Sequence, residues 1–136
     1  MSEFIWPVRV YYEDTDSGGV VYYANYLKFM ERARTEWLRE LGFEQDELLV
    51  RYGIIFAVHR VELEYHRPAR FNDALQVSAR ILHKGRASLT FQQEVRRLGD
   101  PRPLCSGQVQ IACVDLQKLR PRPIPKSILE EIPDAE

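Results

Sequence analysis

The sequence predicts an α+β domain in which a five-stranded antiparallel sheet wraps around one long helix. Three observations predict this fold. A strand-like run opens the chain at residues 4–12, one strongly amphipathic helical segment follows at 24–41, and about four runs of alternating apolar residues occupy most of the chain from 61 to 115. The apolar face of the helix is too wide for one neighbour to cover, so a curved sheet is expected to cover it.

The opening run from Phe4 to Tyr12 is rich in β-branched and aromatic residues, which predicts a strand. A turn is expected at residues 13–19, where Gly18 and Gly19 permit backbone angles that other residues resist. A short apolar link at 20–23 then leads into the helix.

The long helix is expected from about Ala24 to Leu41, and Gly42 stands where a helix C-cap is expected. A shorter helix is expected from about Gln45 to Arg51. The residues of the long helix that recur with the helical period and predict its buried face are Tyr26, Phe29, Met30, Ala33, Trp37, Leu38 and Leu41.

Four further strands are expected from alternation with a period of two, with a hairpin turn at Lys84-Gly85-Arg86 and another turn at 98–101. The tail at 120–125 alternates proline with other residues, so it is neither helix nor central strand. It is expected to lie over the surface before a last short helix near Pro125. The predicted inward residues are Val61, Leu63 and Tyr65, then Leu75, Val77, Ala79 and Ile81, then Leu89, Phe91 and Val95, and finally Val109, Ile111 and Cys113.

Length and charge limit the partners of the chain. Its 136 residues fit a single domain, expected to span residues 1–136. The net charge of −1 comes from mixed acids and bases, which gives no field for a nucleic acid. No signal peptide or membrane span is expected, because no apolar run is long enough, so a cytoplasmic location is expected. Cys105 and Cys113 lie in an apolar segment and are expected to be buried free thiols.

The segment with most chemical information is the turn that precedes the long helix. It carries two carboxylates, Asp14 and Asp16, close to the helix start, where unpaired N–H groups and a partial positive charge suit a developing oxyanion. One carboxylate and a few backbone donors are enough for hydrolysis of a thioester. Its leaving group is a thiol, with a pKa of about 8.5 in the cysteine reference, so it departs without protonation by a strong acid. The interpretation is therefore acyl transfer by one carboxylate and backbone donors.

The run Tyr12-Glu13-Asp14-Thr15-Asp16-Ser17-Gly18-Gly19-Val20-Val21-Tyr22 resembles the signature of hotdog-fold acyl-CoA thioesterases related to 4-hydroxybenzoyl-CoA thioesterase. The similarity is greatest to the YbgC branch, which is associated with the bacterial Tol-Pal system. It continues through residues 29–36, 61–68 and 121–128, and so covers nearly the whole chain. It implies a hotdog fold and hydrolysis of an acyl-CoA to free CoA and a carboxylic acid, with no metal and no cofactor.

The resemblance also implies roles for individual residues. Asp16 matches the catalytic nucleophile or general base, and the backbone N–H of Tyr23 matches the group that polarises the thioester carbonyl. Many members have histidine where this chain has Tyr23, so any part played by that side chain is lost. The predicted substrate contacts are Val21 and Tyr22, together with Lys84, Arg86 and Ser88, whose basic members would meet the CoA phosphates at the rim.

The resemblance further implies that two copies assemble, as a dimer or as a dimer of dimers (a homotetramer), with the site at a subunit interface. An unpartnered sheet face and edge strand favour the same assembly. A contact with an acyl carrier protein is left open.

Other interpretations compete with each of these predictions. Asp16 can simply hold an Asx-turn, and Asp14 is expected to hydrogen-bond the turn rather than react. A calcium loop starting at Asp14 would need a glutamate where Asn25 stands. A phosphatase of the haloacid dehalogenase type would need more chain, and a hotdog dehydratase would need a histidine between residues 11 and 26. His59, His66 and His83 have no regular ligand spacing. The rival of another class is a non-catalytic acyl-binding or adaptor protein.

Overall fold

The structure, a computed structural model, describes residues 3–135. Its helices and strands follow the order that the sequence predicts. They are β1 (Phe4–Arg9), the 3-10 helix η1 (Tyr12–Asp14), α1 (Asn25–Glu40), α2 (Gln45–Tyr52), β2 (Ile54–Tyr65), β3 (Ala74–Lys84), β4 (Ser88–Arg97), β5 (Pro103–Asp115), β6 (Arg120–Pro121) and α3 (Lys126–Leu129).

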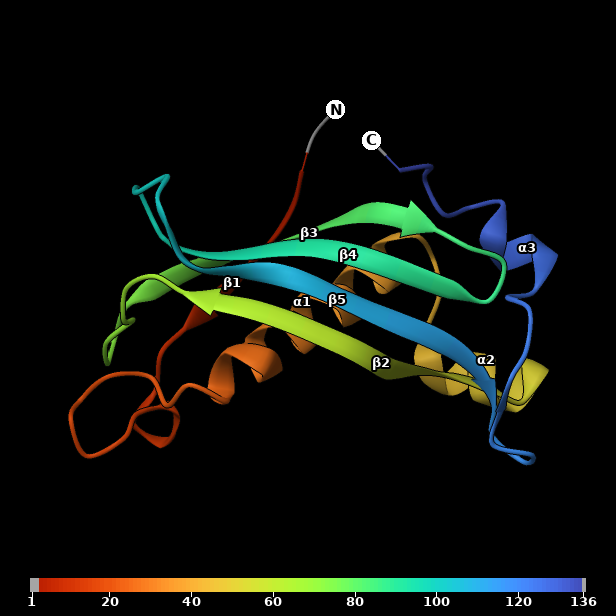
Figure 1. Ribbon diagram of the computed structural model, residues 1–136, viewed down its shortest axis with the longest axis horizontal. Helices are drawn as coiled ribbons and strands as arrows, with labels where there is room; N and C mark the ends of the chain where they lie inside the picture. The colour runs from red at the N-terminus through yellow and green to blue at the C-terminus, as the bar shows by residue number, and fades with distance from the viewer. Residues whose placement is uncertain (1–2, 136) are drawn as a thin grey trace.

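One antiparallel sheet contains all of these strands. Its order is β1-β3-β4-β5-β2, and the two-residue strand β6 continues beside the end of β5. The sheet curls around α1, while α2 and α3 lie at the end where β2 begins (Figure 1). The predicted fold class is therefore confirmed, with β6 as an addition to the five expected strands.

The buried face of α1 is the predicted one, and it packs against β1, β3 and β4. Phe29, Met30 and Ala33 are fully buried, and the ring of Trp37 meets that of Phe91 edge-on with centroids 5.0 Å apart. The helix ends as expected before Gly42, whose φ of +100° is readily adopted only by glycine.

Three strand boundaries differ from the prediction. β1 ends at Arg9 rather than Tyr12, because the chain turns into η1. β2 begins at Ile54, seven residues before Val61. Its side chains become more exposed along the strand, from the buried Ile54 to the exposed Tyr65, instead of alternating between buried and exposed. β5 begins at Pro103, six residues before Val109, the first inward residue predicted for it, and its consecutive buried residues Leu104 and Cys105 break the period of two. A period-two pattern cannot detect such stretches.

The interior contains a polar group where alternation predicts an apolar one. Gln93 lies on the inward face of β4 and is fully buried. Its amide nitrogen donates to the carbonyl oxygens of Met30 and Ser78, each at 3.1 Å, and its oxygen accepts from Arg34 Nη1 at 3.0 Å. Because all these groups are paired, the buried amide joins helix to sheet without an unsatisfied donor.

Both cysteines are free and buried, as predicted. Burial raises the pKa of the Cys105 thiol to about 12, and it also raises the pKa of Cys113. The two thiols are therefore packing groups rather than nucleophiles.

The outer face of the sheet is polar, with Thr90, Gln108 and Gln110 around a shallow hollow near the β2 edge. Such a face does not need an apolar cover. Within residues 3–135, none of the helices combines the length and the apolar character that crossing a bilayer would require.

Candidate active site

The loop that carries Asp16 is closed by its own backbone. Thr15 and Val21 form an antiparallel bridge, the N–H of Asp16 donates to the carbonyl of Val20 at 2.9 Å, and the N–H of Gly19 donates to the carbonyl of Asp16 at 3.0 Å. Gly19 has a φ of +79°, which explains why glycine stands there. Asp16 therefore occupies a defined position at the base of a short closed loop.

A second segment holds this loop against the body of the protein. The N–H of Val21 donates to the carbonyl of Ala69 at 2.8 Å, and Val20 forms a bridge with Arg70. The loop between β2 and β3 thus lies directly beside the loop of Asp16.

The carboxylate of Asp16 is exposed in the single chain. Its Oδ1 accepts a hydrogen bond from the N–H of Gly18 at 2.8 Å, while no partner of Oδ2 occurs among residues 3–135. The Asx-turn is therefore present, as one alternative held, but it occupies only one oxygen. The second oxygen is free to act on water or on a carbonyl carbon.

Asp14 has the structural role expected for it. It is buried, its Oδ2 accepts from the N–H of Tyr11 at 2.8 Å, and its Oδ1 accepts from Asn25 Nδ2 at 3.2 Å. Its carbonyl also accepts from the N–H of Tyr22 at 2.8 Å. With both carboxylate oxygens used, Asp14 ties η1 to the start of α1.

The start of α1 presents backbone donors. The N–H groups of Tyr23 and Ala24 find no acceptor within the described part of the chain, whereas the N–H of Asn25 donates to the carbonyl of Tyr22 at 2.8 Å. The helix dipole adds partial positive charge at this point. This first turn is therefore suited to an oxygen that becomes negative during a reaction.

A hydrogen bond from another strand holds this first turn. The hydroxyl of Tyr65, at the end of β2, donates to the carbonyl of Tyr23 at 3.0 Å. The ring of Tyr65 also meets the rings of Tyr23 and Tyr26 edge-on, with centroids 6.3 and 5.5 Å apart. Desolvation by these neighbours raises the pKa of Tyr65, so the hydroxyl stays a donor at neutral pH.

A hollow of about 280 Å³ lies beside the first turn of α1. The hydroxyl of Tyr26 closes its floor by accepting from the N–H of Ala69 at 3.0 Å. Asp16 and the exposed Tyr22 do not line this hollow. The residues that line it are Val21, Tyr23, Tyr26, Tyr65, His66, Arg67 and Pro68. Sequence reasoning placed Val21 and Tyr23 at the site and Tyr26 on the buried face of the helix. It missed the four residues from β2 and the loop after it, because these reach the helix start only in the folded chain.

Lys84, Arg86 and Ser88 lie at the other end of the sheet. The sheet register pairs the end of β1, which leads into the loop of Asp16, with the start of β3. Lys84 is the last residue of β3 and lies about 33 Å along the strand from its first residue. Lys84 Nζ donates to the carbonyl of Ile132 at 2.7 Å and pairs with Asp134 at 3.3 Å. A single chain does not bring these three residues to Asp16, and their role stays a prediction.

No group of three or more His, Cys, Asp or Glu side chains that could hold a metal ion occurs in residues 3–135. His59, His66 and His83 are all exposed, and His66 Nε2 shares a hydrogen bond with the hydroxyl of Ser106 at 2.8 Å.

Comparison with known proteins shows which proteins the chain resembles in sequence and fold. The model of the thioesterase superfamily matches residues 18–103, a range that begins two residues after Asp16. The acyl-CoA thioester hydrolase YbgC of Escherichia coli O6:H1 is 45% identical over 128 residues, which are 94% of each chain. The acyl-CoA thioesterase YbgC of Haemophilus influenzae is 44% identical over 92% of this chain and 90% of its own.

Solved structures agree with the fold. A probable thioesterase from Bartonella henselae is 33% identical and superposes with a TM-score of 0.83, over 91% of this chain and 100% of that one. A 1,4-dihydroxy-2-naphthoyl-CoA thioesterase from Synechocystis, 21% identical, superposes with a TM-score of 0.87 over 96% of each chain, which shows the shared fold.

Proposed function

This chain belongs to the thioesterase superfamily, and we propose that it hydrolyses acyl-CoA thioesters to free CoA and a carboxylic acid. The observation that carries the proposal is that the loop of Asp16, with one carboxylate oxygen unbonded among residues 3–135, leads directly into the start of α1, where the N–H groups of Tyr23 and Ala24 have no acceptor in the same range. The CoA belongs to the substrate, and the proposal needs no cofactor, because a thiolate leaves without metal assistance. The proposed compartment is the cytoplasm.

The proposed reaction uses few groups. Asp16 takes a proton from water while the water oxygen bonds to the thioester carbon, and the carbonyl electron pair moves to the oxygen that the N–H of Tyr23 stabilises. The intermediate then expels the CoA thiolate, which takes up the proton. In the alternative, the Asp16 carboxylate attacks the thioester carbon itself, and loss of the CoA thiolate from the resulting intermediate gives a mixed anhydride of Asp16 and the acyl group. Water then hydrolyses this anhydride, which releases the carboxylic acid and restores Asp16.

The test is thiol release from a panel of acyl-CoAs with aromatic, short and long acyl groups, read with a thiol-reactive dye. We expect at least one substrate to turn over with kcat/KM of about 10⁴ M⁻¹s⁻¹ or more, the usual range for an enzyme on its own substrate. A protein that binds acyl-CoA without releasing thiol from any substrate would contradict the proposal. That result would support the acyl-binding or adaptor alternative.

We further propose that two copies pair along β2. This strand of 12 residues forms one edge of the sheet, and Val58, Val61 and Tyr65 on it are 53%, 38% and 48% exposed. A long unpaired edge strand with exposed apolar side chains is a template for a second strand. A symmetric antiparallel pairing over its whole length would centre near residues 59 and 60.

Such a dimer would complete the predicted substrate contacts. The start of the partner's β2 would lie beside Tyr65, so Lys84, Arg86 and Ser88 of the partner subunit would lie at the same end as Asp16. A dimer of dimers and docking of an acyl carrier protein remain compatible with this arrangement.

Sedimentation analysis should give at least twice the 16.0 kDa mass of one chain. Placing a charge on the edge with Val61→Lys should shift the protein toward the mass of one chain, because the ammonium would be buried without a partner. Val50→Lys is the matched control, since Val50 lies on α2 and is 88% exposed. An unchanged mass for Val61→Lys would exclude pairing along β2.

A further inference from the structure

The carbonyl of Tyr23, at the start of α1, is bonded by a side chain rather than by the backbone. In a regular helix this carbonyl would accept from the N–H four residues on, that of Leu27. The N–H of Leu27 donates instead to the carbonyl of Ala24 at 3.2 Å. Within residues 3–135 the carbonyl of Tyr23 accepts only from the hydroxyl of Tyr65, at 3.0 Å and from 42 positions away in the sequence.

The peptide group that contains this carbonyl also contains the N–H of Ala24. A peptide group is planar and trans, so its C=O and its N–H point in opposite directions. Ala24 already has helical dihedral angles, with φ of −73° and ψ of −19°, so its N–H points out of the N-terminal end of α1. The hydroxyl of Tyr65 therefore binds the oxygen of a peptide group whose N–H is one of the two unpaired donors at this end.

A hydrogen bond to a peptide oxygen makes the N–H of the same peptide group a better donor. The bond draws electron density toward the oxygen and increases the partial positive charge on the amide hydrogen. Hydrogen bonds linked in this way strengthen one another by about 10–30% per bond. The gain is greatest when the acceptor becomes negatively charged, as the carbonyl oxygen of a thioester does when water or a carboxylate adds to its carbon.

The position of Tyr65 is fixed by the strand that carries it. In the sheet register Tyr65 pairs with Cys105 of β5, and the N–H of the next residue, His66, donates to the carbonyl of Leu104 at 2.8 Å. Leu104 and Cys105 are both fully buried. The ring of Tyr65 also lies edge-on to that of Tyr26, so the hydroxyl is aimed at the carbonyl from both its backbone and its ring.

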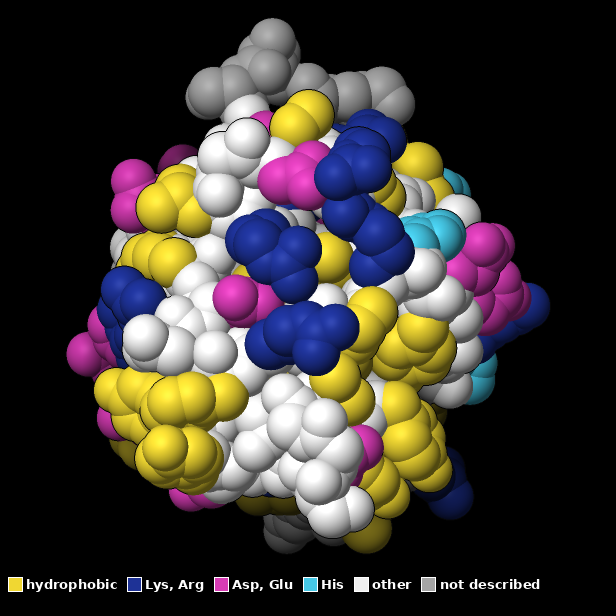
Figure 2. Space-filling view, turned by 90° about the vertical axis from the view of Figure 1, so that its left-hand side faces the viewer, with side chains coloured by type: hydrophobic (Ala, Val, Ile, Leu, Met, Phe, Trp, Pro, Cys, Tyr) yellow, Lys and Arg dark blue, Asp and Glu magenta, His cyan; other side chains and the backbone are white. Residues whose placement is uncertain are grey.

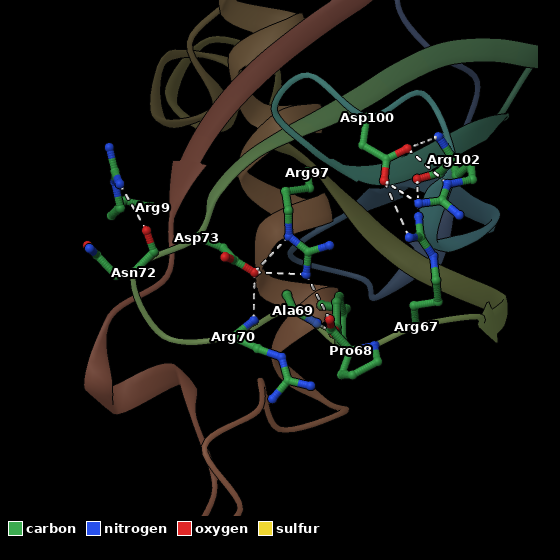
Figure 3. Close-up of polar contacts among 11 residues, drawn as sticks. Arg9, Arg67, Pro68, Ala69, Arg70, Asn72, Asp73, Arg97, Asp100 and Arg102 are labelled. Atoms are coloured by element: carbon green, nitrogen blue, oxygen red, sulfur yellow. Dashed lines mark hydrogen bonds and ion pairs between the residues drawn. The ribbon is translucent and has the colours of Figure 1, made fainter.

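Ion pairs fix the segment that follows Tyr65. Arg67 pairs with Asp100 at 3.3 Å, in the loop between β4 and β5. Asp73, just before β3, pairs with Arg97 at the end of β4 at 3.0 Å (Figure 3). Figure 2 looks onto this end of the molecule and shows Lys and Arg side chains gathered on it. The end of β2 is therefore tied to two other parts of the sheet.

From these contacts we propose that Tyr65 is a positioning residue for thioester hydrolysis. Its hydroxyl holds the first turn of α1 through the carbonyl of Tyr23, and it makes the N–H of Ala24 a second donor to the thioester oxygen, beside the N–H of Tyr23. The inference deepens the proposed function and rests on it. Tyr65 acts through the peptide group and does not touch the reacting atoms, so no proton passes to or from it.

The competing explanation is that the hydroxyl only satisfies a carbonyl that the helix leaves unpaired. A purely structural bond would contribute to stability without changing how the protein polarises a bound thioester. The two explanations therefore differ in what loss of the hydroxyl does to kcat and to the carbonyl of a bound substrate.

Tyr65→Phe removes the hydroxyl and keeps the ring, so the contacts with Tyr23 and Tyr26 should persist. We expect kcat for the preferred acyl-CoA to fall about threefold to tenfold, the rate equivalent of one hydrogen bond, with KM unchanged. Tyr52→Phe is the matched control, because its hydroxyl bonds Ser127 at 3.1 Å, and it should change neither value. Sedimentation should give the same mass for both variants and the unmodified protein.

Infrared spectroscopy reads the polarisation directly. The probe is the acyl-CoA of the panel that binds most tightly, isotopically labelled at its carbonyl carbon and bound to Asp16→Asn, which is expected to leave it intact. Adding Tyr65→Phe should move the carbonyl band to higher frequency, because the oxygen then accepts a weaker hydrogen bond. Adding Tyr52→Phe should leave the band in place.

A backbone substitution tests whether Tyr65 acts through Ala24. Replacing Ala24 with lactic acid puts an ester in place of the amide, which removes the N–H and keeps the methyl side chain and the carbonyl of Tyr23. This change should lower kcat. In the ester protein, Tyr65→Phe should lower kcat by less than about twofold further, because the two changes remove the same interaction.

The inference is overturned if Tyr65→Phe leaves kcat unchanged, if it raises KM instead, or if kcat falls while the carbonyl band stays in place. It is also overturned if Tyr65→Phe has its full effect in the ester protein. The band is recorded without turnover, whereas thiol release by the unmodified protein decides the proposed function. A protein that binds the labelled acyl-CoA and shows the band shift, yet releases no thiol, would therefore contradict the proposed function alone.

Discussion

Replacing Asp16 with asparagine is expected to lower kcat by about 10²-fold to 10⁴-fold, the range that a positioned acid or base contributes. The amide keeps an oxygen that can accept from the N–H of Gly18, so the closed loop should persist. It lacks the negative charge needed to take a proton or attack a carbon. The measurement is thiol release from the preferred acyl-CoA, with KM determined separately from kcat.

The matched control is Glu13→Gln, which removes a charge from an exposed residue just before the same loop. Turnover by this control should stay within about threefold, because the residue has no proposed part in the reaction. Equal denaturation midpoints for the two variants would show that folding is intact. Full turnover by Asp16→Asn would leave Asp16 with only its turn-forming role.

The change Gly107→Ala is expected to destabilise the protein by about 3 kcal/mol or more, the upper range for overpacking a core. Gly107 of β5 pairs with Leu63 of β2 on one side and with Gln93 of β4 on the other. An added Cβ would overlap the carbonyl oxygen of Glu62 and lie 2.9 Å from the Cα of Leu63. Because backbone atoms are in the way, a side-chain rotation cannot relieve the clash, and β2 must shift.

Chemical denaturation monitored by fluorescence measures this effect. A loss of this size is a large part of the roughly 5–15 kcal/mol that stabilises a domain, so the midpoint should fall clearly. Ser106→Ala on the same strand is the control and should cost less than about 1 kcal/mol, because its hydroxyl bonds only the exposed His66. A midpoint unchanged by Gly107→Ala would mean that β2 and β5 are farther apart than the structure shows.

Several elements could be predicted because their signals are local. The period of α1 and Gly42 after it predicted the helix to within one residue at each end. Alternation likewise predicted β3 and β4, which are central strands with one buried face. The edge strand β2 was half missed, because an exposed strand has no such alternation.

The candidate site shows the same division. The turn before α1 was predicted from its carboxylates and glycines, and the structural role of Asp14 followed from its place in that turn. Tyr65 could not be predicted, since it contacts Tyr23 from 42 positions away in the sequence. Nor could the contact between Arg67 and Asp100, which are 33 positions apart in the sequence.

The sequence by itself determined the α+β class, the long helix with its buried face, and the loop that places Asp16 before the helix start. These features depend on neighbours within a few residues, so the order of side chains is sufficient to predict them. Only the tertiary structure decided which side chains surround that loop. Sheet pairing brings the ends of β1, β2 and β4 together at one end, and the sequence order of the strands does not specify which ends meet.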